Sequence, residues 1–278
     1  MTALADPTTV SPATRLRWAL GDALAITRRN LTHVRHVPEK LFDVTLQPVV
    51  FVLLFAYVFG NAIDVPGGSY HEYLMGGIFV QSLAFGIMGT AVGLADDIGT
   101  GVIDRFRSLP MARSAVLAGR ALADVLASAI AIAVLTVSGL VIGWGIHAGV
   151  GSAIAGFALL LLFAYAMTWA GILLGLLVRT PDAAQGIVFI AIFPLTFLAN
   201  TFVATGDLPA GLRAFAEWNP ISAVVAAVRD LFGNPAGLPA DDAWPLEHPV
   251  PVAIAWCVAI IAVCAPLAVR RYRKTTAR

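Results

Sequence analysis

The chain has 278 residues, of which 59% are apolar and 13% are charged, whereas about 25% of residues are charged in an average soluble domain. With a mean hydropathy of +0.83, it carries more apolar surface than a soluble globular protein of this size can bury. The composition therefore excludes a soluble enzyme, a disordered chain and a nucleic-acid-binding protein, while the net charge of +1 is uninformative by itself.

The N-terminal segment, residues 1–37, contains a stretch at 15–36 that is too charged to cross a membrane. Its apolar residues fall on one face of a helix, and charged residues occupy the rest. Two interpretations stay open. The stretch is either an interfacial helix on the inner leaflet, with its arginines near anionic headgroups, or an ordinary surface helix of a small cytoplasmic cap.

Six later stretches are long and apolar enough to cross a bilayer, which takes about 20 mostly apolar residues. They predict an all-α polytopic membrane protein with a transmembrane domain at 38–275. Glycines four residues apart, such as Gly171 and Gly175, predict close helix packing. The expected spans are residues 44–63, 73–95, 122–146, 151–178, 184–203 and 250–269.

The basic residues predict the orientation of these spans. With six spans, all of the 18 Lys and Arg except Arg213 and Arg229 fall on one side of the membrane. Because cytoplasmic loops carry the excess of Lys and Arg, that side is the cytoplasm. Both termini are therefore expected to be cytoplasmic.

The loop between the second and third spans contains a short amphipathic segment at 102–110. Val102, Ile103, Phe106 and Leu109 share one face at helical spacing. Glycines precede the segment and Pro110 ends it. It is either a cytoplasmic helix that contacts another protein or a solvated connector.

The segment between the fifth and sixth spans, residues 204–249, is long and faces outward. Its apolar residues between Ile221 and Phe232 form a helical stripe that is too short to cross the membrane. We expect helices that lie on the outer surface or dip into the membrane and return.

A few polar residues lie within or near the ends of the spans. They either line a substrate route or form hydrogen bonds between helices. These residues are Gln47, Gln81, Thr196, Asn200 and Thr201.

The sequence has no recognisable source of energy or catalytic site. The span cores carry no Asp, Glu, Lys or His except Asp124, which argues against coupling to an ion gradient. A P-loop requires Gly-Lys followed by Ser or Thr, but Lys40 follows Glu39 and Lys274 follows Arg273. We therefore expect no catalytic, cofactor or metal site, and any transport takes its energy from another polypeptide.

Three stretches resemble a known family: Gly101–Arg113, Phe193–Val203 and Glu217–Pro235. They are similar to the permease subunit of an ABC-2 type exporter, specifically the daunorubicin/doxorubicin-resistance permease family of actinobacteria. The resemblance covers nearly the whole chain, with six spans and cytoplasmic ends in the same order. It implies a location in the cytoplasmic membrane of a bacterium.

The resemblance implies a division of labour. A separate ABC ATPase subunit would bind ATP and Mg²⁺, and two permease chains, identical or related, would form the pathway in contact with membrane lipids. Substrates would be hydrophobic compounds such as antibiotics or lipids. Residues 15–36 would be the interfacial elbow helix, and the outer helices would cap the pathway. The contacts to the ATPase would come from Val102, Ile103, Asp104, Arg105, Phe106, Arg107, Leu109 and Pro110.

Two other functions remain as alternatives to an export permease. An intramembrane enzyme is disfavoured because no span supplies a paired Asp or a Ser with a His. A non-transporting assembly or sensor subunit would share the same topology, and only a transport assay separates it from a permease.

Overall fold

The computed structural model describes residues 38–59, 69–101, 113–201, 209–234 and 244–275. Within these ranges all the regular structure is helical. The helices, in chain order, are α2 (Pro38–Phe59), α3 (Tyr70–Gly99), α5 (Arg113–Val141), α6 (Val150–Leu177), α7 (Pro181–Phe197), α8 (Ala210–Glu217), α9 (Pro220–Phe232), α10 (Trp244–Glu247) and α11 (Pro249–Thr275).

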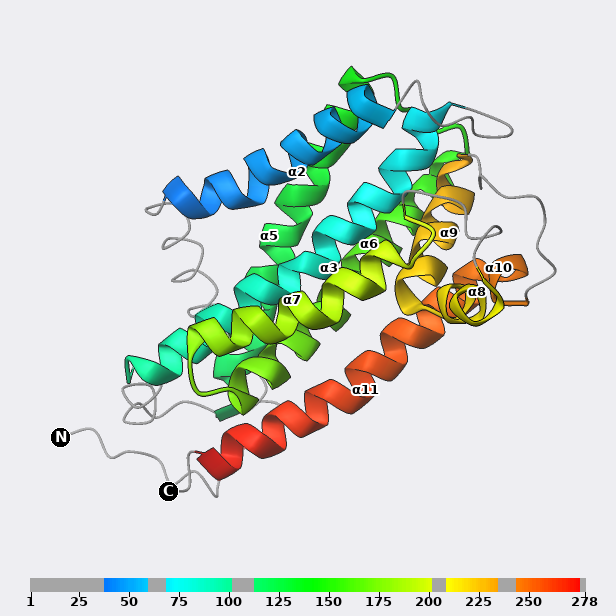
Figure 1. The fold of residues 1–278 in the computed structure, drawn as a ribbon. Helices are drawn as coiled ribbons and strands as arrows, with labels where there is room; N and C mark the ends of the chain where they lie inside the picture. Colours follow the sequence, from blue (N-terminus) through cyan, green and yellow to red (C-terminus); the bar gives the residue numbers. More distant parts are fainter. Residues whose placement is uncertain (1–37, 60–68, 102–112, 202–208, 235–243, 276–278) are drawn as a thin grey trace, which may run out of the picture.

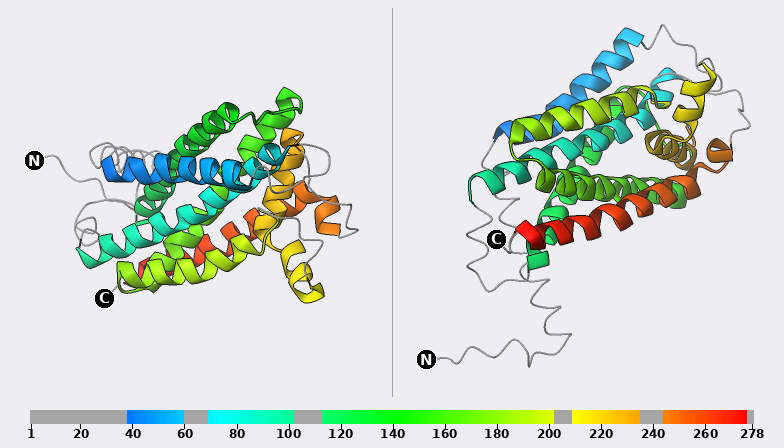
Figure 2. Two further views of the ribbon diagram at one scale, coloured as in Figure 1. Left: turned by 45° about the horizontal axis from the view of Figure 1, so that its top comes forward. Right: turned by 60° about the horizontal axis from the view of Figure 1, so that its bottom comes forward.

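The long helices form a bundle around α3, which contacts α2, α5, α6, α7 and α9 (Figure 1). Successive long helices alternate in direction, so the bundle has two ends. The Gly99 end contains the end of α3, the start of α5, the turn from α6 to α7 and the end of α11. The Tyr70 end contains the start of α3, the turn from α5 to α6, and α9. Figure 2 shows the same arrangement from two further directions.

In the part of the chain that the structure describes, four helices are long and apolar enough to span a membrane: Tyr70–Gly99, Leu117–Val141, Val150–Leu177 and Pro249–Tyr272. They lie at the second, third, fourth and sixth predicted spans, which confirms an all-helical protein with membrane-spanning helices. At the first and fifth predicted positions the apolar helical stretches are shorter, at Pro48–Val58 and Pro181–Phe197.

The third predicted span, 122–146, differs from the observed helix at both ends. Helix α5 begins at Arg113 and ends at Val141. Gly143 has a φ of +94°, which an α-helix does not accept, and the Trp144 N–H folds back onto the Gly139 carbonyl. Hydropathy does not detect this turn because the residues around it are as apolar as those of the helix.

The fifth predicted span, 184–203, also ends earlier than expected. Helix α7 stops at Phe197, with Leu198 as its C-cap. Beyond the cap, the carbonyls of Asn200 and Thr201 turn to Arg229 on α9. The backbone therefore leaves the helix where another helix supplies hydrogen-bond donors for it.

Helices α3 and α6 pack closely because glycines on α6 face the α3 backbone. A Cβ on Gly171 would lie 2.9 Å from the Ile87 carbonyl oxygen, and one on Gly175 would lie 2.8 Å from that of Ala91. These contacts confirm the packing role predicted for this glycine pair.

Gly175→Ala is expected to destabilise the chain by about 1–3 kcal/mol, because the added methyl group meets fixed backbone rather than a movable side chain. The measurement is the free energy of unfolding in detergent. Gly186→Ala on α7 is the matched control, since nothing lies within 4 Å of its Cβ position, and it should be neutral or stabilising. Equal effects of the two variants would contradict the close approach of α3 and α6.

At the Tyr70 end, an aromatic cluster fixes α9 to the bundle. Phe232 on α9 lies 6.1 Å from Phe79, 5.5 Å from Trp144 and 5.0 Å from Phe157 between ring centroids. The Trp144 indole N–H donates to Asn234 Oδ1 at 2.9 Å. Helix α9 is therefore packed inside the bundle end, against α3, α6 and α11, rather than lying loosely on its surface.

The outward faces of the helices are apolar. Large exposed apolar side chains recur on α2, α5, α7 and α11, a distribution that suits a hydrocarbon environment and not water. Examples are Leu53, Tyr57, Ile130, Val137, Phe189, Ile190, Val258 and Val263.

Candidate functional site

Two predicted regions lie outside the described residues. These are the N-terminal stretch 15–36 and the amphipathic segment 102–110, with all eight residues expected to contact an ATPase. The helices that flank the second segment are described up to its edges. Helix α3 ends at Gly99, and α5 begins at Arg113. These two helix ends are therefore the described parts of the chain that lie closest in sequence to the predicted contact.

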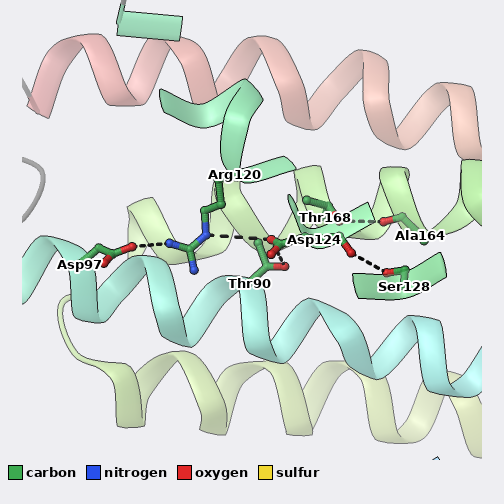
Figure 3. A network of polar contacts seen from close by, with 7 residues as sticks. All are labelled: Thr90, Asp97, Arg120, Asp124, Ser128, Ala164 and Thr168. Carbon is green, nitrogen blue, oxygen red and sulfur yellow. Dashed lines mark hydrogen bonds and ion pairs between the residues drawn. The ribbon is translucent and has the colours of Figure 1, made fainter. Parts of the chain in front are cut away.

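A polar cluster joins α3 to α5 at the Gly99 end (Figure 3). Arg120 Nη1 on α5 lies 2.5 Å from Asp97 Oδ2 on α3, and Arg120 Nε lies 4.0 Å from Asp124 Oδ2 one turn further along α5. The Arg120 side chain is 15% exposed, whereas those of Asp97 and Asp124 are 36% and 30% exposed. The cation is thus largely enclosed between two carboxylates that are partly open.

Asp124 completes the link between the helices. Its Oδ2 accepts a hydrogen bond from the Thr90 hydroxyl of α3 at 2.8 Å. Its backbone carbonyl accepts from the Ser128 hydroxyl at 2.9 Å, within α5. Nearby on α6, the Thr168 hydroxyl donates to its own helix, at the Ala164 carbonyl (Figure 3). Asp124, the single carboxylate in the predicted span cores, therefore helps to connect two helices.

Gly93 provides the space that the guanidinium group occupies. A Cβ at this position of α3 would collide with Arg120 Nη2. Any larger residue at position 93 would push the guanidinium away from Asp97. The cluster therefore depends on a glycine of α3 as well as on its charged groups.

The predicted substrate-path residues lie in different surroundings. Gln81 is buried on α3, whereas the Gln47 side chain on α2 lies outside the described part of the structure. The buried Thr196 hydroxyl donates to the Ile192 carbonyl of its own helix at 2.7 Å. Asn200 and Thr201 are buried beyond the end of α7. The structure brings these last two residues together at the Tyr70 end, against α3 and α9.

Arg229 is the centre of this second polar cluster. Its side chain is buried, and its Nε and Nη1 donate to the carbonyls of Tyr73 and Asn200, both at 2.9 Å. Its Nη2 donates to the Thr201 carbonyl at 3.1 Å. The guanidinium carbon also lies 3.5 Å from the centroid of the Tyr73 ring, which is a cation–π contact. One arginine thus binds α9 to α3 and to the chain that follows α7.

A buried cation is costly unless its surroundings are electronegative. Two of the three acceptors, the Asn200 and Thr201 carbonyls, follow the C-terminal end of α7, where the helix dipole is negative. Burial lowers the pKa of the Arg229 guanidinium, and the contact with Tyr73 opposes that shift. The Arg229 guanidinium is treated as a cation, because arginine is not deprotonated in folded proteins.

Other polar groups strengthen the junction between α7 and α9. The Tyr73 hydroxyl donates to the Asn200 carbonyl at 3.0 Å. Asn219 caps α9 by accepting from the Ile221 N–H at 2.9 Å and donates from its amide nitrogen to the Leu195 carbonyl at 2.7 Å. Asn200 Oδ1 and Thr201 Oγ1 are buried without a hydrogen-bond partner among the described residues. Two of the predicted substrate-path residues therefore have buried side-chain oxygens that can still accept a hydrogen bond.

Sequence reasoning missed both arginines as site residues and used them only as charges that indicate topology. A local signal exists for Arg229, because it interrupts the apolar stripe of α9 between Val228 and Leu231. A signal also exists for Arg120, because Asp124 follows it by four residues on one helix face. Neither signal identifies the partners on α3, which lie far away in the sequence.

Comparison with known proteins places these features in a family. Residues 22–232, which contain both clusters, match the ABC-2 type transporter family. The chain belongs to this family. It is 32% identical over 251 residues to the daunorubicin resistance ABC transporter permease protein DrrB1 of Streptomyces coeruleorubidus, covering 90% of this chain and 85% of that protein.

A second relative extends the comparison to another genus. The chain is 27% identical over 227 residues to the doxorubicin resistance ABC transporter permease protein DrrB of Mycobacterium tuberculosis, covering 78% of this chain and 77% of that protein. Together with the apolar helices, these relatives identify a bacterial multi-pass membrane protein of the ABC-2 permease type. The resemblance noted in the sequence is therefore confirmed.

Proposed function

We propose that this chain is the permease subunit of an ATP-driven exporter, and that a separate ABC ATPase subunit binds ATP and Mg²⁺. The observation that carries the proposal is the 32% identity to an ABC transporter permease protein over 90% of the chain. The sequence supports the separation of roles, because neither lysine stands in a P-loop. The chain itself is then a transport subunit without an ATPase site.

The proposed topology has six spans with both termini in the cytoplasm. Helices α2 and α7 act as the first and fifth spans. At about 1.5 Å per residue, the 17 residues of α7 cover about 26 Å, which is slightly less than the hydrocarbon thickness and can be met by local thinning of the bilayer. The distribution of Lys and Arg supports a cytoplasmic Gly99 end. The Tyr70 end then faces outward.

The contact with the ATPase is proposed at residues 102–110, between α3 and α5. The apolar stripe of this segment would dock in a groove of the ATPase, while Arg105 and Arg107 would pair with acidic groups. The N-terminal segment 1–37 would lie along the cytoplasmic leaflet, and residues 38–275 would form the transmembrane domain. Two such chains, identical or related, would assemble above two ATPase subunits.

The proposed substrates are hydrophobic compounds, either antibiotic-like drugs or lipids. The names of two relatives refer to resistance to daunorubicin and doxorubicin. The apolar character of the described helices supports a pathway for compounds of this kind. The polar residues proposed along the pathway are Gln47, Gln81, Thr196, Asn200 and Thr201.

Transport in inside-out membrane vesicles tests the proposed function. The chain is co-expressed with ABC ATPase subunits encoded in the same genome, and daunorubicin uptake is followed by its fluorescence after addition of ATP. We expect uptake only when the chain, a competent ATPase and ATP are all present. Vesicles with a hydrolysis-deficient ATPase serve as the control. Uptake by the chain alone, or failure with every such ATPase, would overturn the proposal.

A further inference from the structure

The cluster of Arg120, Asp97 and Asp124 lies at an unusual position in the fold. Asp97 is two residues before the end of α3, and Arg120 is seven residues after the start of α5. In the sequence, residues 102–112 connect the end of α3 to the start of α5. The cluster is therefore the polar connection between the two helices that flank this segment in the described part of the chain.

Apolar packing supports the same junction from within the bundle. Leu94 precedes Asp97 by one turn of α3, while Leu117 and Ala121 lie on either side of Arg120 on α5. All three side chains belong to one buried cluster that also includes Ile172 of α6 and Tyr272 of α11. The ends of α3 and α5 are thus held together by ionic contacts on one face and by apolar packing on the neighbouring face.

The chemistry of the cluster favours a rigid connection. Arg120 Nη1 donates a charge-assisted hydrogen bond to Asp97, and Arg120 Nε forms a 4.0 Å ion pair with Asp124, so one cation attracts a carboxylate on each helix. The low exposure of Arg120 reduces screening by water and salt. The hydrogen bond from Thr90 to Asp124 adds a second link about two turns away from Asp97 along α3. Because the two links lie at different positions along α3, they limit the rotation of α5 relative to α3 as well as the distance between the two helices.

We infer that Arg120 is a positioning residue that holds the Gly99 ends of α3 and α5 at one separation. A displacement of segment 102–112 then moves both helices together. Without this clamp, α3 and α5 would respond separately, and part of the motion would be lost in bending the helix ends. The consequence for transport rests on the proposed function, whereas the clamp itself does not.

A distance measurement on the chain alone tests the clamp. Spin labels are attached at Asp96→Cys on α3 and Ala118→Cys on α5, which are both exposed positions. The background carries Cys257→Ala and Cys264→Ala. We expect Arg120→Gln to at least double the width of the distance distribution measured by electron paramagnetic resonance. Arg120→Lys should give an intermediate width, because an ammonium group keeps the positive charge but does not present separate nitrogens to Asp97 and Asp124.

Two further variants sharpen this measurement. Gly93→Ala keeps every charge but collides with the guanidinium, and it should also widen the distribution. Thr136→Val is the matched control, because the Thr136 hydroxyl donates to the Ile132 carbonyl of its own helix, α5, at 2.7 Å. The control should leave the width unchanged. An unchanged width in Arg120→Gln would overturn the clamp.

A second measurement tests the consequence for coupling. Daunorubicin transported per ATP hydrolysed is determined for the full complex of permease and ATPase. We expect Arg120→Gln to lower this ratio at least tenfold, while a purely structural role would lower transport and hydrolysis together with the amount of folded chain. An unchanged ratio alongside a widened distribution would overturn the coupling role. If the wild-type complex transports nothing, the proposed function fails, while the distance measurement still decides the clamp.

Discussion

Replacement of Arg229 by Met is expected to lower the free energy of unfolding by about 3–5 kcal/mol. The substitution removes three hydrogen bonds from a charged donor to buried carbonyls, each of which contributes about 1.5–3 kcal/mol, although the Asn200 carbonyl keeps the Tyr73 hydroxyl as a donor. It also removes the contact with the Tyr73 ring. The measurement is unfolding of the purified chain in detergent, followed by tryptophan fluorescence or circular dichroism.

Two variants separate the role of the guanidinium from that of charge. Arg229→Lys keeps the charge, but one ammonium group does not reproduce the fork that reaches three carbonyls, so an intermediate loss is expected. Asp230→Asn is the control, because it changes the charge of the exposed neighbouring residue. Stability of Arg229→Met equal to that of the control would show that the carbonyls are satisfied in another way.

Arg229 also explains an exception in the distribution of charges. It is one of only two basic residues on the side predicted to face outward. It is buried among backbone carbonyls, and so its place is determined by packing and not by topology. The positive-inside rule concerns residues in loops near the ends of spans. An arginine inside a folded helix junction is outside the scope of that rule.

The sequence predicts the helices well where hydropathy alone determines them. The four helices of the described residues that are long and apolar enough to span a membrane all lie at predicted positions, because a long apolar run has no other stable form in a bilayer. The ends of α5 and α7 were predicted several residues too late. They depend on the conformation of Gly143 and on acceptors for Arg229, and neither leaves a trace in hydropathy.

The polar clusters were less predictable than the helices. Arg120 and Asp97 are 23 residues apart, and Arg229 and Tyr73 are 156 apart. A single sequence identifies side chains that share a helix face but not those that meet across helices. Gly93 shows this limit: its spacing of four residues from Gly89 predicts only helix packing, whereas the structure places the Arg120 guanidinium against it.

Both arginines contact the same helix from opposite ends. Tyr73 and Asp97 lie on α3, and at about 1.5 Å per residue they are about 36 Å apart along its axis. Arg229 connects the first to α9, and Arg120 connects the second to α5. Helix α3, which is also the most buried of the long helices, is thus a rod held at both ends by different neighbours.

Phe106→Asp is expected to lower ATP-dependent daunorubicin transport at least tenfold without reducing the amount of folded chain. Phe106 lies in the apolar stripe with Val102, Ile103 and Leu109, which is proposed to dock on the ATPase. An unpaired carboxylate buried at such an interface costs on the order of 3 kcal/mol, and about 1.4 kcal/mol already corresponds to a tenfold loss of affinity. Transport in vesicles and co-purification of the ATPase are the two measurements.

Ser108→Asp provides the matched control for this substitution, because it introduces the same charge on the opposite, polar face of the segment. It should leave both co-purification and transport close to the wild-type values. A solvated connector would tolerate either carboxylate, since both would remain in water. Wild-type transport by Phe106→Asp would therefore assign residues 102–110 to a connector and move the contact with the ATPase elsewhere on the chain.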